Sequence, residues 1–99
     1  MLKIKKDFKK EKAVFKLKGS LDTITAPELE KELKDSIDGL SELVLDFAEL
    51  DYISSSGLRV LLAAQKLMND QGSMKVTNVN DSVMEIFTVT GFSDILTIE

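Results

Sequence analysis

Strand-like and helix-like segments alternate along this chain, and that alternation restricts the folds it can adopt. Apolar residues at every second position, or in short unbroken runs, predict strands over residues 2–8, 13–17, 43–47, 74–79 and 95–98. Apolar residues at every third or fourth position predict helices over 25–38, 56–70 and 82–90. Strands separated by helices of this length are joined by crossover connections, which make neighbouring strands parallel.

The predicted order is β-β-α-β-α-β-α-β within a single α/β domain that spans residues 1–99. We expect a mixed, mostly parallel sheet of four to five strands with helices packed on it. The first two strands should form a hairpin that adds an antiparallel edge. The apolar run 43–47 is interrupted only by Asp46, which predicts a central strand covered on both faces. The helix over 56–70 is apolar around most of its circumference and should be heavily buried.

Local signals mark the ends of the predicted helices. Thr25 and Glu28 have the spacing of a capping box, and Pro27 falls in the first turn of the first helix, where a missing N–H costs little. The polar segment 80–82 predicts the start of the last helix. The glycines placed to end the three helices are Gly39, Gly72 and Gly91.

The residue types that are missing narrow the available chemistry. The chain has no cysteine and no histidine, which excludes disulfides, thiol catalysis and thiolate metal sites and removes the commonest general base. With 43% hydrophobic and 30% charged residues, the composition is that of a globular protein with its own core. No apolar run approaches the roughly 20 residues that span a bilayer, and residues 1–5 lack the apolar core of a signal peptide. We therefore expect a cytoplasmic protein without a membrane partner.

Charge is unevenly distributed along the chain. Residues 1–18 hold eight lysines against Asp7 and Glu11, whereas residues 19–99 hold five basic and fifteen acidic residues. A basic end of this kind can bind nucleic acid, but lysines on an outer strand also discourage edge-to-edge aggregation. We favour protection of the sheet edge, because neither an aromatic stacking platform nor a second basic patch accompanies the lysines.

Three serines and a glycine, residues 54–57, lie between the predicted central strand and the most hydrophobic helix. Backbone N–H groups at a helix start lack partners and the helix dipole favours negative charge, so this turn could hold a phosphate on serine. Local chemistry alone favours an ordinary helix cap, for which serine is a preferred residue. Gly57 is expected to let a partner's backbone approach, and Arg59 adds a cation nearby. Phosphate at this turn would repel an acidic or apolar partner without unfolding the domain.

Acidic residues precede the serine turn at the carboxyl end of a predicted strand, where open α/β sheets usually place their sites. A Mg²⁺ site or an acid/base pair at Asp46, Glu49 and Asp51 is one interpretation. We favour solvated loop acids, with Asp51 helping to set the turn, because no further ligand type accompanies them. The chain also lacks a serine hydrolase elbow and the glycine-rich nucleotide fingerprints, so we expect no catalytic residues, no metal and no cofactor.

Four segments carry a resemblance to the anti-sigma factor antagonists, the small single-domain members of the bacterial STAS family. Residues 19–22, Gly-Ser-Leu-Asp, resemble the family's Gly-x-Leu-Asp after its second strand, and residues 45–53 resemble its central strand. Residues 54–58, Ser-Ser-Ser-Gly-Leu, resemble its phosphorylation loop, which is usually Asp-Ser-Ser/Thr-Gly-Leu. Residues 90–92, Thr-Gly-Phe, resemble its Ser/Thr-Gly-Leu/Phe before the last strand.

In that family the unmodified antagonist binds an anti-sigma factor that is also an ATP-dependent serine kinase, and this frees a sigma factor for RNA polymerase. The kinase phosphorylates the antagonist and releases it, and a metal-dependent serine phosphatase resets it. The resemblance therefore implies a regulator of transcription that switches partners and is not an enzyme. It further implies a monomer or weak dimer that makes no direct contact with nucleic acid.

Alignment of residues 57–58 with the family's Gly-Leu places the phosphoacceptor at Ser55, with Ser56 and Ser54 as alternatives. Ser54 stands where the family commonly has Asp, and Ser56 is then expected to cap the helix. The partner-binding residues implied by the resemblance are Asp22, Thr23, Ser54, Ser56, Gly57, Leu58 and Arg59. The alternative is an unphosphorylated STAS interaction subunit of a transport or stress-sensing complex, in which the serine turn is merely structural.

Overall fold

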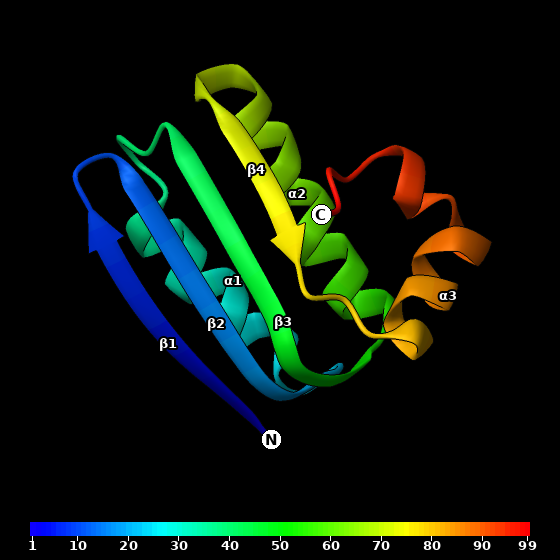
Figure 1. The fold of residues 1–99 in the computed structure, drawn as a ribbon. Helices are drawn as coiled ribbons and strands as arrows, with labels where there is room; N and C mark the ends of the chain where they lie inside the picture. Colours follow the sequence, from blue (N-terminus) through cyan, green and yellow to red (C-terminus); the bar gives the residue numbers. More distant parts are fainter.

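A computed structural model describes all 99 residues as a sheet with helices packed against it (Figure 1). The strands are β1 (Leu2–Lys9), β2 (Lys12–Leu21), β3 (Glu42–Ile53) and β4 (Ser73–Thr77). The helices are α1 (Ala26–Ser36), α2 (Ser55–Gln71) and α3 (Asp81–Thr90), followed by the short 3₁₀ helix η1 (Phe92–Asp94). None of the helices combines the length and the apolar character that crossing a membrane requires.

The four strands follow their chain order across the sheet, β1-β2-β3-β4. β1 and β2 pair antiparallel as a hairpin, and the pairs β2–β3 and β3–β4 are parallel. The predicted mixed sheet with an antiparallel edge is therefore confirmed. The pairing of β2 with β3 shifts register twice, between Lys16 and Lys18 and between Gly19 and Ser20, as at a β-bulge.

The fifth strand predicted over residues 95–98 does not form. Only Ile98 pairs with the sheet, through an isolated parallel bridge to Val76 of β4. The backbone N–H of Val76 donates to Thr97 O at 2.8 Å, and the N–H of Glu99 donates to Val76 O at 2.9 Å. The preceding residues are taken up by η1 and its turn, so too few residues remain extended to make a strand.

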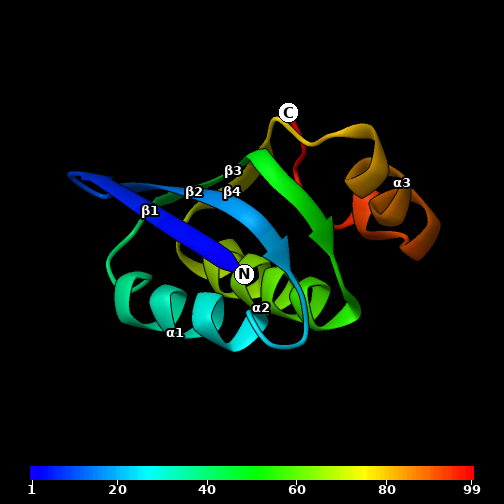
Figure 2. The ribbon, with the colours of Figure 1, turned by 90° about the horizontal axis from the view of Figure 1, so that it is seen from below.

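Helices α1 and α2 cover one face of the sheet, and the other face is open (Figure 2). Along β3 the buried residues Leu43, Leu45 and Phe47 alternate with the partly exposed residues Val44 and Asp46. The prediction that this strand is covered on both faces is therefore wrong, because an unbroken apolar run does not report which faces are covered. Helix α3 packs beside the sheet, where the rings of Phe87 and Phe47 lie 6.3 Å apart.

Helices α2 and α3 end at the predicted Gly72 and Gly91, whereas α1 ends at Ser36 with Ile37 as its C-cap, before Gly39, and two of the predicted N-caps are wrong. Thr25 makes no side-chain cap to α1, so the predicted capping box is absent. The Thr25 hydroxyl instead accepts a hydrogen bond from Asp22 N and donates to Ser20 O, both at 2.8 Å.

Helix α2 begins one residue earlier than expected, with Ser54 rather than Ser56 as its cap: Ser54 Oγ accepts from Gly57 N at 3.3 Å. Asn80 caps α3 in the same way.

The carboxyl end of α2 is held against the loop that precedes β3. The side-chain amide of Gln71 donates to the carbonyls of Ile37 and Leu40, each at 2.7 Å. A Cβ added at Gly72 would lie 1.9 Å from Ser41 O, and that carbonyl already accepts from Ser73 N at 2.9 Å. Only glycine allows α2 to end this close to the loop.

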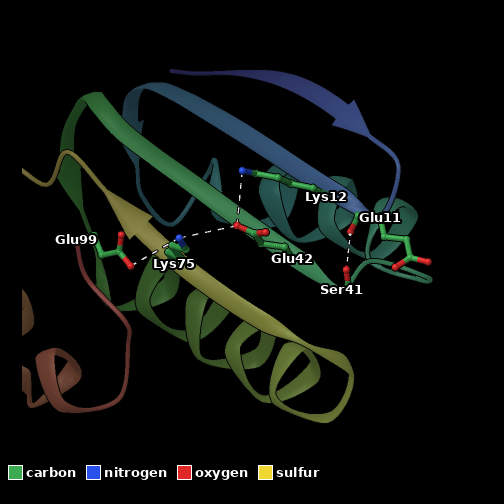
Figure 3. Close-up of polar contacts among 6 residues, drawn as sticks. All are labelled: Glu11, Lys12, Ser41, Glu42, Lys75 and Glu99. Atoms are coloured by element: carbon green, nitrogen blue, oxygen red, sulfur yellow. Dashed lines mark hydrogen bonds and ion pairs between the residues drawn. The ribbon is translucent and has the colours of Figure 1, made fainter.

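Ion pairs link the strands across the open face (Figure 3). The carboxylate of Glu42 lies 3.6 Å from Lys12 Nζ on β2 and 3.9 Å from Lys75 Nζ on β4, and Lys75 lies 3.7 Å from the carboxylate of Glu99. Ser41 in the loop before β3 lies next to Glu11 in the hairpin turn, and Ser41 N donates to Glu11 O at 2.8 Å. At this end of the open face Lys12 and Lys75 each have a carboxylate partner, whereas Lys9, which lies opposite Lys12 in the hairpin, has none within 4 Å.

We expect Gly72→Ala to lower the free energy of unfolding by about 2–3 kcal/mol, because the added methyl group meets backbone atoms of Ser41 that cannot move without breaking a hydrogen bond. Urea unfolding of the variant measures the loss. Ser73→Ala is the matched control, since the neighbouring side chain is exposed and its N–H is retained. Equal unfolding free energies for the two variants would contradict the packing argument.

We also expect Ser54→Ala to cost about 1 kcal/mol of stability, because Gly57 N loses the oxygen that caps it. Ser56→Ala, which removes a hydroxyl from the same helical turn without removing the cap, should leave the stability within about 0.5 kcal/mol. Thermal unfolding followed by circular dichroism compares them. A larger loss in Ser56→Ala than in Ser54→Ala would return the cap to Ser56.

Candidate functional site

Two loops meet at the carboxyl ends of the central strands, and between them they carry most of the residues predicted to form the site. The loop after β2 contains Asp22 and Thr23, and the turn after β3 contains the three serines. The backbone N–H of Ser54 donates to Leu21 O at 2.8 Å, which joins the turn to the end of β2. The register places Leu21 opposite Ile53, so the strand pairing itself brings the two loops together.

The three serines occupy different environments. Ser54 is extended and partly buried, and its side chain is engaged as the cap of α2. Ser55 is exposed at the first position of the helix, and its hydroxyl makes no hydrogen bond within the protein. Ser56 is partly buried and faces a small hollow toward α1. Only Ser55 therefore presents an exposed hydroxyl that is free of internal partners.

Gly57 and Leu58 belong to the interior of the domain. Both are buried, and Leu58 retains only 6% of its exposed area. A Cβ added at Gly57 would lie 2.8 Å from side-chain carbons of both Ile53 and Leu21. The missing side chain at Gly57 thus lets α2 pack onto the ends of β2 and β3, which differs from the expectation that it opens the site to a partner's backbone.

Asp22 organises the loop after β2. Its Oδ1 accepts hydrogen bonds from the backbone N–H groups of Ile24 and Thr25, both at 2.9 Å. The bond from Thr25 N, with a further contribution from Ile24 N, lowers the pKa of the Asp22 carboxyl below its ordinary value because these bonds favour the charged form. The Asp22 side chain therefore stabilises the conformation of its own loop.

A hollow of about 190 Å³ lies where the two loops approach the start of α1. Thr23, Ser56 and Arg59 contribute to its lining, together with residues at the start of α1. Arg59 is exposed and has no carboxylate within 4 Å. Three of the predicted partner-binding residues, from two loops and one helix, are thus brought together here.

Two exposed apolar side chains flank this region and were not predicted from the sequence. Ile24, in the loop after β2, is 82% exposed, and Tyr52, near the end of β3, is 49% exposed. For Ile24, the sequence signal that could have predicted this exposure is an apolar residue within a polar loop. For Tyr52 the strand alternation gives no such signal, because the register shifts in β2 alter the local pairing.

The acidic residues before the serine turn lie within β3 and not in a loop. Asp46 Oδ1 accepts from Ala48 N at 2.9 Å and from the Asn78 amide at 3.0 Å, and Glu49 pairs with Lys18 at 3.7 Å. Asp51 is exposed and its side chain makes no hydrogen bond, so it does not set the turn as expected. No group of three or more carboxylates in the structure is placed to hold a metal ion.

Two bacterial regulatory proteins are similar in sequence to this chain. BtrV of Bordetella bronchiseptica, a candidate anti-sigma factor antagonist, is 42% identical over 81 residues, which cover 80% of this chain and 70% of BtrV. The anti-sigma-B factor antagonist of Bacillus subtilis is 30% identical over 81 residues, which cover 81% of this chain and 74% of that protein.

Solved structures share the fold at low sequence identity. An anti-sigma factor antagonist from Mycobacterium paratuberculosis matches 99% of this chain and 85% of its own, with a TM-score of 0.90 at 20% identity. The phosphorylated form of the Bacillus cell fate determinant SpoIIAA matches 98% of this chain and 91% of its own, with a TM-score of 0.77 at 17% identity. The STAS domain model matches residues 3–99. The chain belongs to the STAS domain family.

Proposed function

We propose that this protein is an anti-sigma factor antagonist whose binding is switched by phosphorylation of Ser55. The unphosphorylated form binds an anti-sigma factor with serine kinase activity and so frees a sigma factor. Phosphorylation of Ser55 releases the complex, and a serine phosphatase restores the binding form. The names of the relatives support the antagonist role, and the exposed, unpartnered hydroxyl of Ser55 is the observation that supports the switch.

The position of Ser55 in α2 suits a switch that leaves the fold intact. A phosphate there adds about −1.5 to −2 charge at the start of a helix of 17 residues, where the dipole and the free N–H groups favour an anion. The first turn of α2 contains no acidic residue to repel it. Arg59 lies four residues further along the helix, on the same side, and supplies a nearby cation. The modified domain therefore keeps its structure.

The partner is then released by a local change in charge. The surface that the partner would cover combines the exposed side chains of Thr23, Ile24 and Ser55 with the hollow beside Ser56 and Arg59. An apolar or acidic surface of the anti-sigma factor pressed against Ser55 has no room to solvate a phosphate and is repelled by it. The protein acts in this proposal by binding and not by catalysis.

Ser55→Ala should abolish phosphorylation by the cognate kinase and ATP while leaving partner binding within about twofold, because the hydroxyl makes no contact that the fold needs. Ser55→Asp should weaken binding about tenfold or more by placing a carboxylate at the interface. Peptide mass spectrometry locates the phosphate, and isothermal titration calorimetry measures the affinity.

Two further variants show which serine is used. Ser56→Ala should be phosphorylated normally, and Ser54→Ala should be phosphorylated at Ser55 despite its weaker cap. Phosphate found only at Ser56, or outside residues 54–56, would refute the assignment. Tight binding that phosphorylation does not weaken would instead indicate a fixed interaction subunit.

The charge on Asp22 should stabilise the folded protein at neutral pH but not in acid. Because the folded-state pKa is lowered from 3.8, the contribution is complete above the unfolded-state pKa and is lost as the pH falls through the folded-state value. Asp22→Asn keeps an oxygen acceptor but removes the charge, so its stability deficit relative to the parent should shrink as the pH is lowered from 6 to about 3. Urea unfolding across this range measures it.

The matched control is Asp51→Asn, which removes the same charge from an exposed side chain without hydrogen bonds. We expect its stability to follow that of the parent more closely at pH 6 than Asp22→Asn does. A deficit in Asp22→Asn that stays constant with pH would show that the charge on Asp22 does not stabilise the loop.

A further inference from the structure

Four lysines of the β1–β2 hairpin share the open face of the sheet, on the side away from α1 and α2. The register places Lys3 opposite Lys18 and Lys5 opposite Lys16, while the residues between them on each strand, Ile4 and Leu17, face the helices. We call Lys3, Lys5, Lys16 and Lys18 the lysine face. They line a shallow hollow of about 540 Å³, to which Glu49, Ile4 and Leu17 also contribute.

The lysine face carries more positive charge than its neighbours neutralise. Lys18 lies 3.7 Å from the Glu49 carboxylate, but both groups are largely exposed, which makes the pair weak. Lys3, Lys5 and Lys16 have no carboxylate within 4 Å.

Two further acids share this side of the sheet but form no ion pair with the lysine face. The register sets Asp46 beside Lys16, but Asp46 Oδ1 is occupied by Ala48 N and the Asn78 amide. Asp7, opposite Val14 in the hairpin, is likewise not paired with a lysine. The four ammonium groups face the three carboxylates of Glu49, Asp46 and Asp7, so one net positive charge remains on this side.

The opposed lysines lower the stability of the isolated domain. Like charges directly opposite each other on neighbouring strands are destabilising, and the hairpin contains two such pairs in succession. Of the other lysines in the strands, Lys6 pairs with Glu32 of α1, and Lys12 and Lys75 pair with Glu42 (Figure 3), whereas Lys9 has no carboxylate within 4 Å. Two like-charge pairs therefore lie side by side only on the lysine face.

Protection of the sheet edge accounts for only half of the lysine face. Lys3 and Lys5 lie on β1, which is an edge strand, and their charges discourage pairing with another chain. Lys16 and Lys18 lie on β2, which is paired on both sides with β1 and β3 and has no free edge. Another reason is needed for the two lysines of the inner strand.

We propose that the lysine face is a docking surface for an acidic segment of a partner protein, a stretch rich in aspartate and glutamate. Carboxylates between the opposed ammonium groups would relieve both like-charge pairs at once. Nucleic acid fits less well, because no aromatic residue lines the hollow to stack a base. The fifteen acidic and five basic residues of 19–99 would also repel a long polyanion.

This surface is separate from the serine turn. The lysine face lies on the open side of the sheet, whereas α2, which carries Ser55, lies on the covered side (Figure 2). A partner on the lysine face would leave the serine turn accessible, so the two surfaces can be occupied together. The inference therefore does not depend on the switch at Ser55.

The test uses the whole chain and a short fluorescein-labelled peptide that alternates glutamate with serine, with fluorescence anisotropy at physiological ionic strength. We expect Lys3→Glu/Lys5→Glu to weaken peptide binding about tenfold or more, because the sign of the charge on the face is reversed. The matched control, Lys31→Glu/Lys66→Glu, changes the net charge equally on exposed positions of α1 and α2 and should bind within about twofold of the parent.

Folding of the test variant is checked in the same experiment. Lys3→Glu/Lys5→Glu converts both like-charge pairs of the lysine face into opposite-charge pairs, so its urea midpoint should equal or exceed that of the parent. Ser55→Asp should bind the peptide as the parent does, which separates this surface from the proposed switch. The proposal is overturned by equal losses in both lysine variants, by no binding of the peptide, or by tighter binding of a single-stranded oligonucleotide of equal charge.

Discussion

One backbone hydrogen bond, from Ser54 N to Leu21 O, fixes the geometry on which the site depends. It closes the pairing of β2 with β3 at its last residue and sets the turn after β3 against the loop after β2. Gly57 allows this approach, since any side chain there would collide with Leu21 and Ile53. The start of α2 is therefore seated on the ends of two parallel strands, and the Asp22 loop is carried alongside it. Exposed residues that are far apart in the sequence become one surface because these few buried contacts are made.

This position of α2 on the strand ends gives the neighbouring serines different roles. The hydroxyl oxygen of Ser54 accepts a hydrogen bond from Gly57 N, so the first turn of α2 is capped without a contribution from Ser55. Ser55 is exposed and its hydroxyl makes no hydrogen bond within the protein. It lies at the helix start, where the helix dipole favours an added negative charge. A phosphate on Ser54 would instead disrupt the cap, and one on Ser56 would enter the partly closed hollow beside α1. The turn thus separates the group that holds the helix from the group that can be changed at low cost to the fold.

Features set by local chemistry could be predicted from the sequence, and features set by distant contacts could not. Helix periodicity, the start of α3 within residues 80–82 and its end at Gly91 depend on residues within a few positions, and all three are as expected. The cap at Thr25 was predicted from spacing alone, but its hydroxyl is drawn away by Asp22 N and Ser20 O. The coverage of β3 depends on where the helices pack, which its own residues do not encode. The position of Ser54 as a cap depends on its bond to Leu21, another strand's residue.

The open face of the sheet gives this small domain a second side that is chemically unlike the first. The covered side presents a helix start and an exposed isoleucine, and the open side presents lysines and their partial counterions. Between the two lie the sheet and its buried core. At physiological ionic strength the Debye length is about 8 Å, so charge added at Ser55 is largely screened before it can reach the lysine face around the outside of the molecule. The arrangement therefore permits the affinity of one surface to change while that of the other is preserved.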